Sequence, residues 1–111
     1  MALRMKPWVK VHNAIDATAT SDTIDCTGFN GLAVMARFSA AQNWTFSIKG
    51  GMGKDAGTFA ACYDNGGTAM SKQTNADIFF VFHNVPDYVQ VTATEDVNGA
   101  TVTVWVAPCQ V

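Results

Sequence analysis

The chain has 111 residues and a formal net charge of −2; 49% of its residues are hydrophobic and only 14% are charged. This hydrophobic content excludes a disordered chain, and the slightly acidic balance gives no electrostatic footprint for nucleic acid. The share of charge is well below the usual value of about 25%, which predicts that other protein covers part of the surface. The length predicts one domain over residues 1–111, and the abundance of Thr and Val with a single glutamate favours strands over helices.

The first residues, 1–10, combine Arg4, Lys6 and Lys10 with Trp8, and we expect a flexible basic arm there. This segment lacks the apolar core of a secretory signal, and no apolar run in the sequence has the length of a membrane helix. Synthesis in a reducing cytoplasm is therefore expected. The three cysteines, an odd number at wide spacing, are expected to be small hydrophobic residues, with one disulfide among them as the alternative.

Strand patterns recur about every ten residues along the chain. Residues 69–75 fit either a short edge strand or an irregular connection, while 14–22 and 50–57 are expected to be loops. The spacing predicts an all-β fold with little or no helix, a single antiparallel β-sandwich of seven to eight short strands. The expected strands are 8–12, 23–27, 32–38, 43–49, 58–63, 77–83, 88–94 and 100–106.

The last quarter of the chain has the clearest alternation. Val89, Val91 and Ala93 share one face of a predicted strand and Tyr88 lies on the other. In the segment 100–106 the valines share one face, and Thr103 and Trp105 share the opposite face. Asn98 and Gly99 lie between these strands and favour a tight hairpin turn. The hairpin would join Tyr88 and Trp105 in one aromatic–threonine surface, and the final strand would form a sheet edge open to pairing.

This aromatic surface has three interpretations. A subunit interface is favoured because Trp and Tyr are enriched at interfaces and the chain has little charge. A sugar-stacking platform and a second packed layer inside the fold are the alternatives. The other aromatic residues considered are expected in the core: Trp44, Phe46, Phe59, Phe79, Phe80 and Phe82.

No motif predicts catalysis. The glycine-rich run 50–54 lacks the spacing of a phosphate loop and has Asp55 where a magnesium-binding Ser or Thr would stand. His12 and His83 are the only histidines, and an enzyme would require one of them to meet an Asp in a pocket. We therefore predict a protein that is not an enzyme, with no catalytic residue, no cofactor and no metal site.

Three stretches together resemble small β-sandwich virion proteins of tailed bacteriophages, namely 23–34, 44–50 and 85–91. The resemblance extends over about residues 23–106 and implies a jelly-roll-like sandwich in a capsid decoration, cement or tail accessory protein. It further implies a virion location, the major capsid protein or another virion protein as partner, and a homotrimer. No site residue of that family can be transferred, because no motif is specific enough.

The predicted function is therefore a structural virion protein that binds between capsomers and stabilises the shell. A carbohydrate-binding or host-attachment module of the tail is the alternative. Neither a nucleic acid nor a membrane is an expected partner. The predicted interface residues are Trp105, Tyr88, Thr103, Trp8, Arg4 and Lys6.

Overall fold

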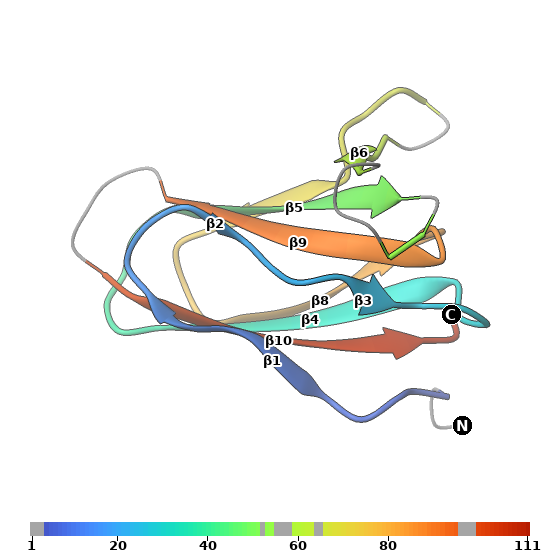
Figure 1. The fold of residues 1–111 in the computed structure, drawn as a ribbon. Helices are drawn as coiled ribbons and strands as arrows, with labels where there is room; N and C mark the ends of the chain where they lie inside the picture. The colour runs from blue at the N-terminus through green and yellow to red at the C-terminus, as the bar shows by residue number, and fades with distance from the viewer. Residues whose placement is uncertain (1–3, 52, 55–58, 64–65, 96–99) are drawn as a thin grey trace.

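The computed structural model describes residues 4–51, 53–54, 59–63, 66–95 and 100–111 as two facing antiparallel sheets (Figure 1). The described residues form no helix, so the predicted all-β sandwich is confirmed. The strands are β1 (Val9–Ile15), β2 (Ala19–Thr20), β3 (Ile24–Asp25), β4 (Gly31–Phe38), β5 (Trp44–Gly51), β6 (Ala60–Ala61), β7 (Ser71–Thr74), β8 (Ile78–His83), β9 (Tyr88–Glu95) and β10 (Val102–Cys109).

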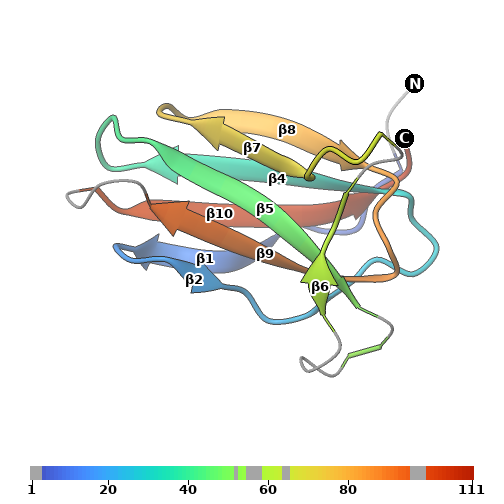
Figure 2. The ribbon, with the colours of Figure 1, turned by 90° about the horizontal axis from the view of Figure 1, so that it is seen from above.

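Sheet A has the strand order β1-β10-β4-β8, and sheet B is built around β9 and β5. In sheet B, β2 and β3 pair with the outer side of β9, and β6 and β7 pair with β5. Figure 2 shows the long strands of the two sheets lying across one another. Each sheet therefore has one face toward the other sheet and one face toward solvent.

The core lies between the sheets and follows the predicted alternation. Val89, Val91 and Ala93 of β9 are buried against the valines of β10, as expected. Trp44 and Phe46 are fully buried, and Phe82 is nearly so. Most of the large apolar side chains are therefore buried between the two sheets. This burial stabilises the fold, because each Å² of apolar surface removed from water contributes roughly 25 cal/mol.

The expected core position of Phe79 is wrong, since its side chain is 53% exposed. The expected strand 77–83 contains β8, which lies at one edge of sheet A. Its neighbours Phe80 and Phe82 point into the core, so strand alternation turns Phe79 outward.

The predicted hairpin of the last quarter is also wrong. β9 and β10 belong to different sheets, and the turn residues 96–99 lie outside the described part. β10 is not an edge strand, because it pairs with β1 on one side and β4 on the other. Alternation in the sequence predicts which face of a strand is buried, but it does not predict which strands are paired.

The expected flexible arm is paired with the sheet over its described part. The Lys6 amide donates to the Pro108 carbonyl at 2.9 Å, and the Gln110 amide donates to the Arg4 carbonyl at 2.8 Å. Met5 forms a bridge with Cys109, and β1 begins at Val9. Residues 4–10 thus extend sheet A along β10, while residues 1–3 lie outside the described part.

The segments expected to be loops or irregular connections contain short strands in part. The expected loop 14–22 contains β2, and the ambiguous segment 69–75 contains the short edge strand β7. Gly50 and Gly51, expected in a loop, end β5; a Cβ on Gly50 would lie 2.5 Å from Pro86 Cγ, so only glycine fits there. The remainder of the expected glycine-rich loop falls partly outside the described residues.

Candidate docking surface

A row of four side chains runs across the outer face of sheet A, one from each strand. The register pairs Lys10 with Trp105, Trp105 with Met35, and Met35 with Phe79. Directly opposed residues of paired strands point to the same face, so the row lies on the solvent side of the sheet. Trp105 and Met35 are half-buried and Phe79 is exposed.

Trp8 lies over this row from the edge of β1. Its indole ring meets the Phe79 ring edge to face, with centroids 5.7 Å apart and an interplanar angle of 68°. The adjacent outer row contains Ala107 and Ala33, whose small side chains leave room for an indole to reach across β10 and β4. Trp8 remains 38% exposed. We call Trp8, Met35, Phe79 and Trp105 the outer aromatic face.

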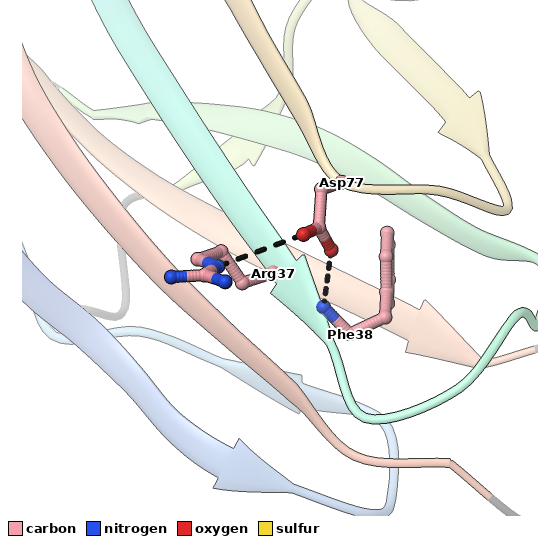
Figure 3. Close-up of polar contacts among 3 residues, drawn as sticks. All are labelled: Arg37, Phe38 and Asp77. Atoms are coloured by element: carbon pink, nitrogen blue, oxygen red, sulfur yellow. Dashed lines mark hydrogen bonds and ion pairs between the residues drawn. The ribbon is translucent and has the colours of Figure 1, made fainter.

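Two cations border the outer aromatic face. The Lys10 ammonium lies 5.6 Å from the centroid of the Trp105 ring. Arg37 lines an open hollow of about 310 Å³ together with Trp8, Met35 and Trp105. Arg37 Nε lies 3.6 Å from Asp77 Oδ2, while Asp77 Oδ1 accepts the Phe38 amide at 2.9 Å (Figure 3). Asp77 thus holds the start of β8 against the end of β4.

Of the six predicted interface residues, the structure brings Trp8, Trp105 and Thr103 to this face. Thr103 pairs in register with Arg37, and its hydroxyl accepts the Ala14 amide at 3.0 Å. Ala14 has a φ of 49°, in the left-handed region that a non-glycine residue rarely adopts. Thr103 therefore also braces the irregular end of β1.

Arg4, Lys6 and Tyr88 lie elsewhere. The Arg4 guanidinium and the Lys6 ammonium lie 4.8 Å and 5.6 Å from the centroid of the Phe29 ring. Lys6 Nζ also donates to the Asp25 carbonyl at 3.1 Å, which ties the start of the chain to β3. Tyr88 is half-buried on β9 in sheet B, so the predicted joint surface of Tyr88 and Trp105 does not form.

Sequence reasoning missed four members or neighbours of this surface: Lys10 as a neighbour of Trp105, and Met35, Arg37 and Phe79. One signal was available in β4, where Met35 and Arg37 alternate with the buried Val34 and Ala36. An arginine two residues after a methionine marks that face of the strand as solvent-facing. No such signal existed for Phe79, because its neighbours on both sides are apolar.

A second hollow lies at the open side of the sandwich. This cleft of about 420 Å³ lies between β1 and residues 22–25, and Val9, which is 56% exposed, is one of its apolar residues. The volume falls within the range of ligand pockets, roughly 300–1,000 Å³. Its charged lining contains lysines and aspartates in equal number, so it offers no net charge to select a ligand: Lys6, Lys10, Asp22 and Asp25.

The two histidines lie in different surroundings. His12 is buried, and its Nε2 lies 3.0 Å from the Val91 carbonyl oxygen, which joins β1 to sheet B. His83 is exposed at the end of β8. Among the described residues, no group of three or more His, Cys, Asp or Glu side chains could hold a metal ion. The prediction that the protein is not an enzyme stays a prediction.

All three cysteines are free. Cys26 and Cys109 are buried and Cys62 is half-buried, in agreement with the expected role of small hydrophobic residues. Burial raises the pKa of the Cys26 thiol to about 12 and also raises the pKa of Cys62 and Cys109. These thiols are therefore protonated near neutral pH and are poor nucleophiles.

Comparison with known proteins gives a fold but no family. No protein-family model matches the chain, and no curated protein matches its sequence. Among solved structures, the fold is similar to the crystal structure of the SPBc2 prophage-derived protein YomS, with a TM-score of 0.66 and 15% sequence identity. The match covers 99% of this chain and 96% of that chain. The two chains thus share one β-sandwich architecture along almost their whole length.

The predicted resemblance to phage proteins is matched in part, because the structural neighbour comes from a prophage. The described residues also contain no helix of the length and apolarity needed to span a membrane.

Proposed function

We propose that this chain is a non-enzymatic structural protein of a tailed-phage virion that decorates the capsid and stabilises the contacts between capsomers. The observation that carries the proposal is the outer aromatic face, a group of large apolar side chains left on the solvent side of sheet A. Trp8 and Phe79 are both exposed there and lie outside the core between the sheets.

The chemistry of this face fits a protein partner. Interface centres are enriched in aromatic residues, methionine and arginine, and are depleted in other charges. The outer aromatic face supplies two tryptophans, a phenylalanine and Met35, with Arg37 at its border. A decoration protein binds in many copies, so modest contacts at each copy are enough to hold the shell together. The likeness to a prophage-derived protein supports this setting.

The experiment is co-sedimentation with capsid shells of the encoding phage that were assembled without this chain. Wild-type protein should sediment with the shells, and Trp105→Ala should weaken binding by about 30-fold, as truncation of a central aromatic anchor does. Tyr63→Ala is the matched control, because Tyr63 is 62% exposed and is not part of the outer aromatic face. An absence of wild-type binding at micromolar concentration, or equal binding by both variants, contradicts the proposal.

Host attachment through carbohydrate is the second candidate, favoured by the two exposed aromatic rings. Sugar platforms use flat faces, however, and Trp8 and Phe79 meet at 68° and not in one plane. The platform of Tyr88 and Trp105 that the sequence predicts does not form either, because the two residues lie in different sheets. Binding on a glycan array that is lost in Trp8→Ala would favour this function over capsid decoration.

A further inference from the structure

The free edge of β8 is unlike the other edges of the two sheets. A bare strand edge invites pairing with another chain unless the strand is short, bulged or charged. β2, β3 and β6 have only two residues each. β1 carries two register shifts, and the edge strand β7 carries Lys72 in register with the inward-facing Phe46.

β8 has none of these protective features. Its six residues, Ile-Phe-Phe-Val-Phe-His, include no proline, lysine or acidic residue and pair with β4 in an unbroken register. Within the described residues, only β4 pairs with β8. Figure 2 shows β8 at the outer margin of its sheet, beside β4.

We propose that β8 pairs antiparallel with β8 of a second copy, so that two four-stranded sheets join into one sheet across a two-fold axis. Opposed residues must share a face, and the outward residues of β8 are the odd-numbered ones. Odd positions must therefore oppose odd positions. One such register places Phe80 opposite Phe80 of the second copy and Phe79 opposite Val81 of the second copy.

Polar residues at the two ends of β8 favour this register. Asp77 immediately precedes β8, and His83 ends it. With Phe80 on the axis, Asp77 faces His83 of the second copy, and the symmetry repeats this contact at the other end. A shift by two residues in either direction removes both contacts. The Asp77 carboxylate is half-exposed and borders the hollow beside β8, where a second chain could reach it.

The pairing has a consequence for the outer aromatic face. A two-fold axis perpendicular to the sheet keeps both outer faces on the same side, and Phe79 of each copy then lies near the junction. The dimer would present two outer aromatic faces to one partner surface. The inference rests on the edge of β8 and not on the proposed capsid role, so either can fail alone.

The first test is the mass of the full chain by light scattering at high micromolar concentration. The expected mass is twice the chain mass of 11.9 kDa. A monomer, or the trimer that the phage resemblance implies, overturns the inference. Trp105→Ala should leave the mass unchanged, because β10 is internal. If the mass of that variant falls to that of a monomer, the subunit contact involves Trp105, as the sequence predicts, and the inference about β8 is wrong.

The second test addresses the register through one exposed position. His83→Asp would set two aspartates against each other at both ends of the paired strands, and His83→Lys would place opposite charges there. We expect the dissociation constant of the His83→Asp dimer to be about tenfold higher than that of the His83→Lys dimer. Equal constants overturn this register. Because residue 83 is exposed, both variants should fold, which circular dichroism can verify.

A third test locates the opposed residues covalently. The double variant Phe79→Cys with Val81→Cys places thiols directly opposite each other across the two-fold axis, within reach of a disulfide. Oxidised glutathione should convert it to a covalent dimer that dithiothreitol reverses. The single variant Phe79→Cys faces Val81 of the second copy and should remain uncrosslinked. Equal cross-linking of the single and double variants contradicts the register.

Discussion

The outer faces of the two sheets differ in chemistry although both sheets cover the same core. The outer face of sheet B carries small polar and charged side chains in opposed pairs along β5 and β9. The outer face of sheet A carries two tryptophans, a methionine and a phenylalanine. The outward pairs of β5 and β9 are Thr45–Thr94, Ser47–Thr92, Lys49–Gln90 and, at the end of β5, Gly51–Tyr88.

This difference separates what folding requires from what function requires. Most outward pairs of β5 and β9 are polar, and the aromatic side chains of Tyr88 and Phe59 gather only at the end of β5, beside Gly51. The Trp8 and Phe79 rings are exposed and contact each other outside the core between the sheets. An exposed apolar patch of this kind marks an interaction site more often than a folding requirement.

The largest expected effect contrasts an inner with an outer phenylalanine. Phe46→Ala should lower the free energy of unfolding by about 3–5 kcal/mol, because it leaves a cavity between the sheets. Phe79→Ala should cost about 1 kcal/mol or less, since half of the ring is already in water. Urea denaturation of both variants measures the difference. Similar losses would mean that the outer aromatic face is part of the structural core.

A second contrast concerns how β2 and β3 are attached to β9. The buried Ser21 lies between them, accepts the Val91 amide on its Oγ and donates its own amide to the Val91 carbonyl, both at 2.9 Å. Ser21→Ala leaves a buried amide without its acceptor and should cost about 1–3 kcal/mol.

Thr20→Ala is the matched control for Ser21. It removes an exposed hydroxyl that pairs with the Thr92 hydroxyl at 3.0 Å, and it should cost about 0.5 kcal/mol or less. If the two variants unfold at the same urea concentration, the hydroxyl of Ser21 does not hold this edge of sheet B.

The smallest expected effect is a pH dependence at β3. Hydrogen bonding from the Thr27 amide lowers the pKa of Asp25 below its usual value of 3.8. A lowered pKa in the folded state stabilises the fold above the unfolded-state pKa, and this contribution is lost as pH falls through the folded-state pKa. Asp25→Asn should therefore be slightly less stable than wild type at pH 7. The two urea midpoints should converge near the acid end of the titration; a constant gap across pH would contradict this origin.

The sequence predicts the parts of the fold that depend on local alternation. The stripes of β9 and β10 identify their buried valines, and the clean alternation of Trp44, Phe46 and Ile48 identifies the inward face of β5. The pairing of strands could not be predicted in this way, because it depends on residues far apart in the sequence. The Asn98–Gly99 signal favoured a hairpin, but packing places β10 between β1 and β4.

The candidate site was predictable only in part. Trp105 was recognised because it shares a strand face with threonine, and Trp8 because it lies near the start of the chain beside basic residues. Phe79 lies in a continuous apolar run, where no polar residue reveals which face is solvated. The contact between the Trp8 and Phe79 rings depends on the strand order β1-β10-β4-β8. A local sequence pattern does not predict that order.

The most direct test removes both tryptophans of the outer aromatic face while leaving the core intact. Trp8→Thr combined with Trp105→Thr leaves Met35 and Phe79 as the large side chains of that face. Co-sedimentation of this variant with undecorated capsid shells should fall to background, while circular dichroism retains the β spectrum and wild-type protein still binds. Binding equal to wild type by the folded variant would contradict the claim that the outer aromatic face is the docking surface.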